Sequence, residues 1–358
     1  MSKVYFLETD LKTFEREPKM LVNFLDKTEL FSLIKNKSLV GIKMHFGEDK
    51  NKGYLKPHYI KGLVEKIKRL GANPFLFDTN TLYRGKRTNS VDHFNLAFFG
   101  HNFKTLNIPL IIGGGLKSKE YIEVDVSGKH FKKAKITSLL RDVDVVLVLS
   151  HLTGHMLTGF GAAIKNLGMG CASRAGKMEQ HCEVSPSVRH DICVKCKKCI
   201  STCLAEAISL KEDKILIDKA KCTGCAQCIS ECPKGAIKIA WSEDYALMQE
   251  KMVEYAKAAC DLCGLKFFVN FSLFVTEECD CMSKEGSPAA LDSGILASVD
   301  PLSLDKASVD LAIAKNKKDI FKDMHSEVDY SSQFKYAEDI GLGEIDYVLE
   351  KVSYEKRT

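Results

Sequence analysis

Eight cysteines between residues 193 and 232 have a spacing that suits metal binding. They form two runs of the same Cys-x-x-Cys-x-x-Cys-x-x-x-Cys pattern, namely Cys193, Cys196, Cys199 and Cys203, then Cys222, Cys225, Cys228 and Cys232. Thiolates are soft ligands, and three cysteines spaced in this way can wrap around one cubane iron–sulfur cluster. The duplication therefore predicts two clusters.

The duplicated pattern, with Pro233 after the last cysteine, resembles that of the bacterial two-cluster ferredoxins. The resemblance implies that the fourth cysteine of each run binds the cluster of the other run. One 4Fe–4S cluster would be bound by Cys193, Cys196, Cys199 and Cys232, and the second by Cys222, Cys225, Cys228 and Cys203. Leu204 departs from the pattern because ferredoxins usually have proline there, which puts the local turn in doubt.

Other uses of these cysteines fit less well. A disulfide framework is typical of small secreted domains, whereas this chain has 358 residues and begins without the long apolar segment of a signal peptide. A zinc ribbon would leave four of the eight thiols without a role. The apolar runs are too short to cross a bilayer, so we expect a cytoplasmic protein without membrane contact.

The formal net charge of +5 is mild, and two oxidised clusters would nearly cancel it. No interleaving of basic and aromatic residues argues for nucleic acid. Lys195, Lys197 and Lys198 lie between the first ligands, where they either steer an acidic electron-transfer partner or form a solvated rim. We expect an electron donor or acceptor protein as the partner.

Outside the cysteine runs, short apolar segments alternate with amphipathic helical patterns. We expect strands at 39–46, 74–78, 109–112, 143–149 and 265–275, and helices at 57–70, 241–259 and 301–315. This alternation predicts an α/β fold, with a mostly parallel sheet and helices on both faces. A small α+β dicluster ferredoxin-like module at 188–240 would interrupt it, dividing the α/β domain into 1–187 and 241–358.

Polar residues follow several of these strands, at the edge where such sheets bind ligands. We expect His45 and His155 to act there as proton donors or metal ligands, with His181 as a further candidate. Lys165 and Arg174 would bind the anionic group of a small-molecule substrate. The alternative is that the glycine-rich segment 151–181 is a close-packed lid and that its histidines are packed and hydrogen-bonded.

Four further cysteines flank the last of the expected strands. A strand of about ten residues spans roughly 33 Å, so Cys260 and Cys263 should lie at the opposite end from Cys279 and Cys281. Cys279 and Cys281, with His181, then form either a third metal site, better suited to iron or zinc than magnesium, or a redox pair. Cys260 and Cys263 are expected to be structural or free thiols.

Several short motifs, in one order along the chain, are together similar to an uncharacterised iron–sulfur-centre protein family, domain of unknown function three-six-two. They are His45-Phe46-Gly47-Glu48, Asp78-Thr79-Asn80-Thr81, the segment 159–166, Gln180-His181, both cysteine runs and Cys279-Asp280-Cys281. The family implies an α/β fold with a two-cluster ferredoxin insertion, and no settled substrate or reaction. Its fold is distantly similar to that of nickel-pincer lactate racemases, although no motif here carries their cofactor residues.

Two functional hypotheses follow from the sequence. In the first, two 4Fe–4S clusters relay electrons to a substrate or an additional metal ion at the sheet edge, where His45, His155 and Lys165 act. In the second, the protein is a non-catalytic electron carrier or an accessory protein for metal or cofactor assembly.

Overall fold

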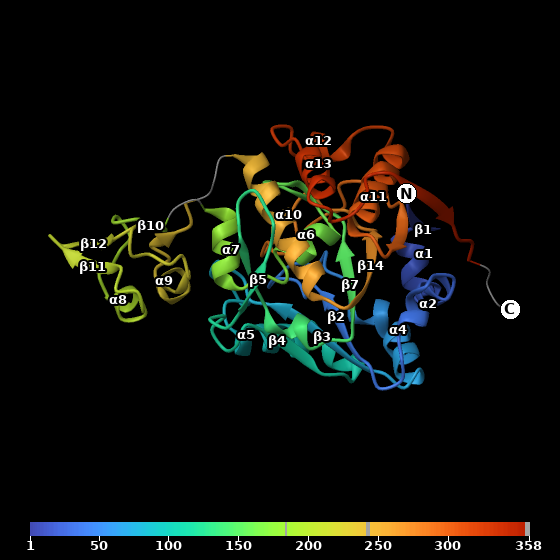
Figure 1. The fold of residues 1–358 in the computed structure, drawn as a ribbon, viewed down its shortest axis with the longest axis horizontal. Helices are drawn as coiled ribbons and strands as arrows, with labels where there is room; N and C mark the ends of the chain where they lie inside the picture. Colours follow the sequence, from blue (N-terminus) through green and yellow to red (C-terminus); the bar gives the residue numbers. More distant parts are fainter. Residues whose placement is uncertain (183–184, 241–243, 355–358) are drawn as a thin grey trace.

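The structure is a computed structural model, and it describes residues 1–182, 185–240 and 244–354. Its centre is one eight-stranded sheet (Figure 1). In spatial order the strands are β16 (Tyr347–Lys351), β1 (Ser2–Glu8), β15 (Gly294–Ser298), β14 (Leu265–Ser272), β7 (Val145–His151), β2 (Leu39–Met44), β3 (Asn73–Thr79) and β4 (Leu110–Gly113). Only β15 runs antiparallel to its neighbours, so the predicted mostly parallel α/β sheet is confirmed.

The remaining elements outside the cysteine runs surround this sheet. The helices are α1 (Leu11–Arg16), α2 (Met20–Leu25), α3 (Leu30–Leu33), α4 (Pro57–Arg69), α5 (Ser90–Asn95), α6 (Ala163–Gly168), α7 (Arg174–His181), α10 (Tyr245–Leu262), α11 (Pro301–Asn316), α12 (Ile320–Met324) and α13 (Ser331–Asp339). A π-helix (Leu96–Gly100) and two 3-10 helices (Phe103–Leu106 and Ser138–Arg141) are shorter. Two small hairpins are β5 (Ile122–Asp125) with β6 (Lys133–Ile136), and β8 (Thr153–His155) with β9 (Gly159–Gly161).

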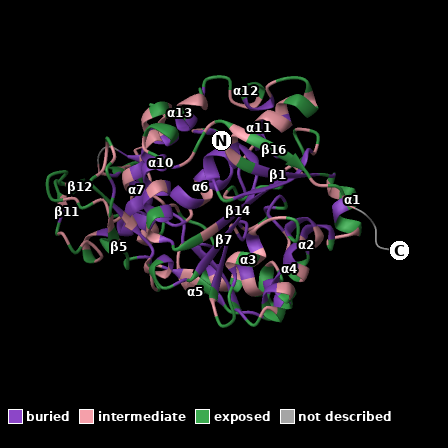
Figure 2. Cartoon of the chain, turned by 45° about the vertical axis from the view of Figure 1, so that its right-hand side comes forward, coloured by how far each residue is buried: buried purple, intermediate pink, exposed green. Residues whose placement is uncertain are grey.

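Both faces of the sheet are buried, because alternate residues of the central strands enter two different cores. On β7, Val146 and Val148 pack into one core with α6, α10 and α11. Val145 and Leu147 point the other way, into a core with α2 and α4. The purple interior in Figure 2 follows these layers. Burial on both faces explains why β7 is apolar along almost its whole length.

The structure corrects several sequence predictions. The expected helix 241–259 runs from Tyr245 to Leu262, and residues 241–243 lie outside the described part. The expected strand 265–275 already ends at Ser272. Strands β1, β15 and β16 were not predicted, because they pair with partners far away along the sequence. No helix within the described ranges is both long and apolar enough to span a membrane.

The parallel strands β14, β7, β2, β3 and β4 all end at the same edge of the sheet. His45 follows β2, Asp78 and Thr79 end β3, and His151 ends β7. Residues 273–282 leave the end of β14 and run along this edge, where Gly154 N donates to Thr276 O at 2.7 Å. The edge therefore gathers the polar residues, as the sequence predicted.

The segment that carries the two cysteine runs contributes no strand to the large sheet. Its elements are β10 (Ser187–Val188), α8 (Lys198–Ser201), β11 (Ile208–Lys211), β12 (Lys214–Ile217), α9 (Gln227–Glu231) and β13 (Ile237–Lys238). β10 pairs with β13, and β11 pairs with β12. In Figure 1 this segment stands beside α7, at the opposite side of the molecule from β16.

Substitution of Asp305 on α11 tests which contacts hold helix α6 in place. Its carboxylate accepts the backbone N–H groups of Ala163 and Ile164, both at 2.9 Å, and Asn270 Nδ2 at 2.7 Å. Asp305→Ala leaves these buried donors without an acceptor, so we expect the free energy of unfolding at pH 7 to fall by about 3 kcal/mol. Urea denaturation measures this. The control Asp261→Ala, which removes a surface pair with Lys257, should change it by less than about 0.5 kcal/mol.

Candidate functional site

A chain of four buried, alternately charged side chains underlies the carboxyl edge of the sheet. Lys43 Nζ lies 2.9 Å from Asp78 Oδ1, and Arg87 Nη1 lies 3.6 Å from Asp78 Oδ2. Arg87 Nε then lies 3.3 Å from Glu48 Oε2. Burial alone would raise the pKa of Asp78, but Lys43, His93 and Arg87 hold it below its usual value. These contacts fix the ends of β2 and β3 to each other.

The positive charge of Lys165 acts on all three predicted histidines. It lies on α6, and its side chain folds over Gly161, where a β-carbon would come within 2.6 Å of its Cδ. Burial lowers the pKa of Lys165 to about 7, while Asp280 and Glu278 oppose the shift. Its positive charge also lowers the pKa of His45, His155 and His181.

Backbone N–H groups point at Nδ1 of both His45 and His155. Gly47 N–H donates to His45 Nδ1 at 3.0 Å, and the N–H groups of Leu157 and Thr158 both point at His155 Nδ1 from 3.2 Å. Burial and nearby cations lower the pKa of both histidines well below its usual value. A neutral imidazole that accepts at Nδ1 carries its proton on Nε2.

The surroundings of Nδ1 bear on the two roles that the sequence allowed. A histidine that binds a metal through Nε2 normally donates from Nδ1–H to an acceptor. His45 Nδ1 instead accepts from Gly47 N–H, so this contact would have to break for Nε2 to bind a metal. His155 Nδ1 also lies 2.9 Å from Thr158 Oγ1, which donates to Phe160 O and can itself accept, so the contacts of His155 are compatible with either role.

Helix α7 separates the site from the cysteine runs. Lys177 donates to Thr79 Oγ1 at 2.5 Å and to Ala172 O at 2.7 Å, and burial lowers its pKa to about 7. One turn later, His181 lies close to Lys165, and burial lowers the pKa of His181 to about 3. Met178, on an adjacent stripe of the helix, packs with the cysteine segment.

Arg174, at the start of α7, does not face a ligand as predicted. Its guanidinium donates to three backbone carbonyls, those of Thr81, Thr88 and Lys117, and to Ser230 Oγ at 3.2 Å. Burial lowers its pKa to about 10, which nearby Glu231 and Cys225 oppose. Arg174 therefore joins the α/β body to the second cysteine run.

Cys279 and Cys281 reach the predicted edge, joined to each other as a disulfide. Asp280 between them accepts from His151 Nδ1 at 3.0 Å, and its backbone carbonyl accepts from Glu48 N–H at 3.0 Å. The pairing with Asp280 raises the pKa of His151 against the effect of burial. The two sulfurs are bonded to each other here, so they are not thiolate ligands in this arrangement. A redox role for the pair and a third metal site with His181 both stay predictions.

Cys260 and Cys263 lie at the opposite end of β14, as expected. Both are buried in the core that contains α6 and α10. Burial raises the pKa of the Cys260 thiol to about 12, and it raises that of Cys263 as well. Neutral thiols in an apolar core act as small hydrophobic side chains.

The cysteines of the two runs occupy two neighbouring places in one small core. A cavity is lined by Cys193, Cys196, Cys199 and Cys232, together with apolar and lysine side chains. Burial raises the pKa of Cys228 to about 12, and Cys225, Cys222, Cys199 and Cys203 lie near enough to add to this effect. In the described ranges, no three His, Cys, Asp or Glu side chains are grouped as one metal ion would require.

The second run faces the body of the protein. Arg84 Nη1 donates to Pro233 O at 2.6 Å, Lys117 Nζ lies 2.7 Å from Glu231, and Gln227 Nε2 donates to Lys117 O at 2.9 Å. Leu82 and Met178 pack against the cysteine core itself. The first run, with the exposed Cys196, lies further from the sheet.

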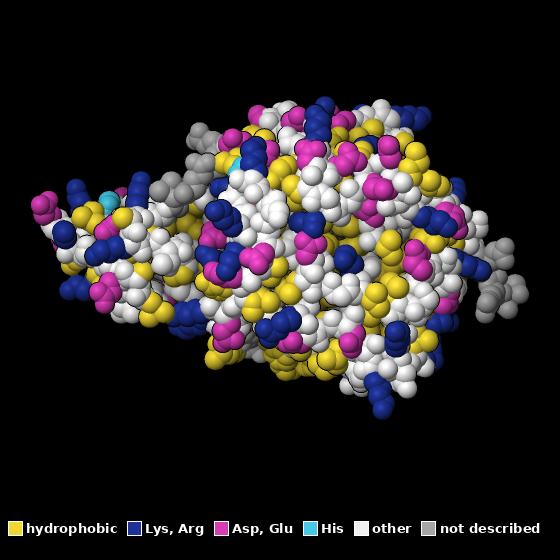
Figure 3. All heavy atoms as spheres, in the orientation of Figure 1, with side chains coloured by type: hydrophobic (Ala, Val, Ile, Leu, Met, Phe, Trp, Pro, Cys, Tyr) yellow, Lys and Arg dark blue, Asp and Glu magenta, His cyan; other side chains and the backbone are white. Residues whose placement is uncertain are grey.

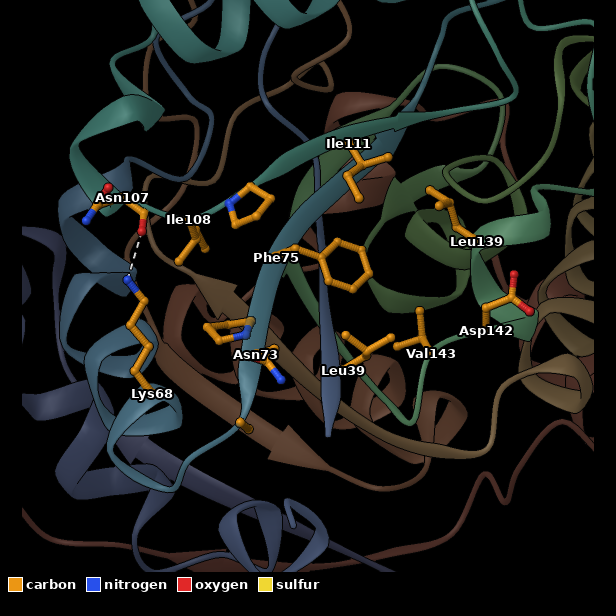
Figure 4. A pocket seen from close by; sticks show the side chains of 13 residues that line it. Leu39, Lys68, Asn73, Phe75, Asn107, Ile108, Ile111, Leu139, Asp142 and Val143 are labelled. Carbon is orange, nitrogen blue, oxygen red and sulfur yellow. Dashed lines mark hydrogen bonds between the residues drawn. The ribbon is translucent and has the colours of Figure 1, made fainter. Parts of the chain in front are cut away.

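A separate cavity lies at the other edge of the sheet (Figure 4). Leu39, Phe75 and Val143, at or near the amino ends of their strands, line it, and Lys68 donates to Asn107 O at 2.8 Å beside it. It is remote from the polar strand ends, and its labelled side chains are mostly apolar. We therefore do not assign the site to this cavity.

Comparison with known proteins identifies the family. Residues 40–310 match the family described as domain of unknown function, DUF362. The chain belongs to this family. No curated protein matches the chain. The matched range includes the sheet-edge residues and the positions of the two cysteine runs.

Two solved structures are similar to this DUF362 protein at low identity. The lactate racemase apoprotein from Thermoanaerobacterium thermosaccharolyticum is 15% identical over 76% of this chain and 51% of its own, with a TM-score of 0.41. A structural-genomics protein from Thermotoga maritima is 14% identical over 87% and 61%, with a TM-score of 0.46. The chain thus spans about half to three fifths of these proteins, and neither likeness bears on its chemistry.

Sequence reasoning missed two of the charged residues beneath the site. Lys43 lies within an apolar strand. A lysine at such a position needs a buried partner, so the sequence did indicate a buried ion pair there. Arg87 lies in a loop with no such signal. Tyr83, whose hydroxyl donates to Cys281 O at 3.3 Å, was also not recognised.

The lowered pKa of Lys165 predicts a pH-dependent stability. The folded state loses the proton near pH 7 and the unfolded state only near 10.5, so the wild type should gain stability as pH rises from about 7. Lys165→Met removes the titrating group and with it this dependence of stability on pH. We expect the variant's stability relative to wild type to be highest at pH 6 and to decline towards pH 9 in urea denaturation. Lys61→Met, at an exposed position on α4, should show no such trend.

Proposed function

We propose that this DUF362 protein is an iron–sulfur redox protein that delivers electrons to an anionic small molecule at the Lys165 site. The observation that carries the proposal is the cavity lined by Cys193, Cys196, Cys199 and Cys232. The ligand set expected from the ferredoxin resemblance takes three residues from the first run and one from the second, and the cavity has this same composition. Cysteines of one run alone could not line a cavity of this composition.

The donor set and its surroundings fit two 4Fe–4S clusters. A cubane binds each thiolate at a different iron, so its four sulfurs need not converge on one point as they would around a single ion. Backbone N–H groups of Ala207 and Ala236 point at the sulfurs of Cys203 and Cys232, from 3.3 and 3.1 Å. Such hydrogen bonds stabilise thiolate charge. When bound, the clusters would supply one-electron transfer.

The Lys165 site supplies hydrogen-bond donors to a bound anion. His45 presents Nε2–H, and the Lys165 ammonium lies close enough to His45 and His155 to lower their pKa values. Arg87 Nη2 is buried and without an acceptor among the described residues. These donors would hold an oxygen-rich group and compensate the negative charge that reduction adds. A pure electron carrier would have no use for such a cluster of donors.

The partner and the compartment belong to the same proposal. Val194 is an exposed apolar residue next to the first run, with Lys197 and Lys198 nearby. An electron donor protein with an acidic rim would fit this surface. On the face shown in Figure 3, basic and acidic side chains are otherwise interspersed. Thiolate ligands require a reducing compartment, so we place the protein in the cytoplasm.

Metal analysis tests the proposal. Anaerobically purified protein should contain about eight irons and eight acid-labile sulfides per chain, in line with two cubanes. Cys196→Ser and Cys225→Ser should each lose about four irons, because each removes a ligand of a different cluster.

Cys260→Ser is the matched control, since this thiol is buried in the other core and should leave iron unchanged. Stoichiometric zinc in place of iron in the anaerobic protein would refute the proposal.

A further inference from the structure

The disulfide between Cys279 and Cys281 stands out among the cysteines of this chain. The other twelve cysteines are free thiols, and eight of them are the proposed cluster ligands. Cys279 is buried, whereas Cys281 is partly exposed. One oxidised pair thus lies in a protein that otherwise depends on reduced sulfur, and such pairs are usually redox-active rather than structural.

A structural role would be served poorly by this bond. A disulfide stabilises a fold mainly by restricting the unfolded chain, and the effect grows with the length of the loop it closes. Here it closes a loop with one intervening residue. The loop is also held without it, since Met282 N–H donates to Cys279 O at 3.0 Å, and Asp280 is bound by His151 and Glu48. The bond can therefore open without loss of the local shape.

The disulfide is linked to the cysteine segment through residues 82–83. Tyr83 hydroxyl donates to the carbonyl of Cys281 at 3.3 Å. Leu82 belongs to the same small core as Met178, Cys199 and Cys228, and Tyr83 packs against that core. Two consecutive residues therefore connect the core that contains the proposed cluster ligands with the disulfide loop.

A cation lies beside the pair. Lys165 interacts electrostatically with Asp280, between the two cysteines, and with the preceding Glu278. A nearby ammonium favours the thiolate form of cysteine. Lys165 would thus stabilise the thiolate that forms as the S–S bond breaks, before that sulfur takes up its proton.

We propose that Cys279–Cys281 is the internal two-electron acceptor of this protein. The S–S bond breaks on uptake of two electrons and two protons, giving two thiols. The electrons come one at a time from an external one-electron donor by way of the cysteine segment. The inference rests on the proposed function, and it adds that one-electron delivery is converted here into a two-electron thiol step.

Alkylation of the loop tests this without any substrate. Cluster-loaded full-length protein is reduced anaerobically with photoreduced deazaflavin, quenched in acid, alkylated and digested with trypsin. Residues 267–284, between Lys266 and Lys284, carry both cysteines. We expect this peptide to gain two alkyl groups after reduction and none before. Cluster absorbance is recorded in the same samples.

Three variants sharpen the test. Tyr83→Phe removes the contact with Cys281 and should slow alkylation at least fivefold, whereas Tyr121→Phe, away from the loop, should not. Cys196→Ser should slow it at least tenfold, while a phosphine reductant should still open the disulfide in every variant.

The outcomes separate the two proposals. Clusters that bleach while the peptide remains unalkylated would overturn the inference and leave the proposed function standing. A peptide that is fully alkylated before reduction would also overturn it. Protein without iron would overturn both.

Discussion

The buried charge chain Lys43–Asp78–Arg87–Glu48 holds together the parts on which the rest of the structure depends. Leaving one member of such a chain unpaired costs about 3–5 kcal/mol, so its geometry is strongly enforced. It ties the end of β2 to the end of β3. Arg87 also accepts Thr81 N–H through its carbonyl, which closes the loop that carries Leu82 and Tyr83, and Glu48 N–H holds the Asp280 loop. The cysteine segment and the disulfide loop are thereby positioned by one interaction network.

The two faces of helix α7 contact two different parts of this arrangement. Arg174 and Met178 face the cysteine segment, while Lys177 and His181 face the Lys165 site. The two stripes lie on one short helix, whose diameter with side chains is about 10–12 Å. A rotation of the helix would disturb both sides at once, so the distance between the cysteine core and the donors is set by rigid secondary structure rather than by a loop.

The sequence allowed the prediction of features that arise from local patterns. The cysteine spacing, the alternation that forms β2, β3 and β7, and the meeting of their polar ends at one edge were all visible. The pairing of β1 with β15 and β16 was not, because it depends on contacts across almost the whole chain.

The role of the histidines also depended on structure. The surroundings of His155 Nδ1 are set by the turn at 157–158, whose N–H groups and Thr158 hydroxyl contact it. The sequence predicted that Arg174 binds an anion, because glycines and cations surround it along the chain. In the structure its guanidinium instead donates to three backbone carbonyls.

The position of β1 has a consequence for biosynthesis. It lies between β15 and β16, which are translated long after it, and one edge of β7 must wait for β14 across the entire cysteine segment. A ribosome-bound chain therefore exposes unpaired strand edges until β15 and β16 have been translated, and folding is dominated by non-local contacts, which makes it slow and prone to aggregation. Nascent chains of this protein should accordingly depend on chaperones more than their size alone would suggest.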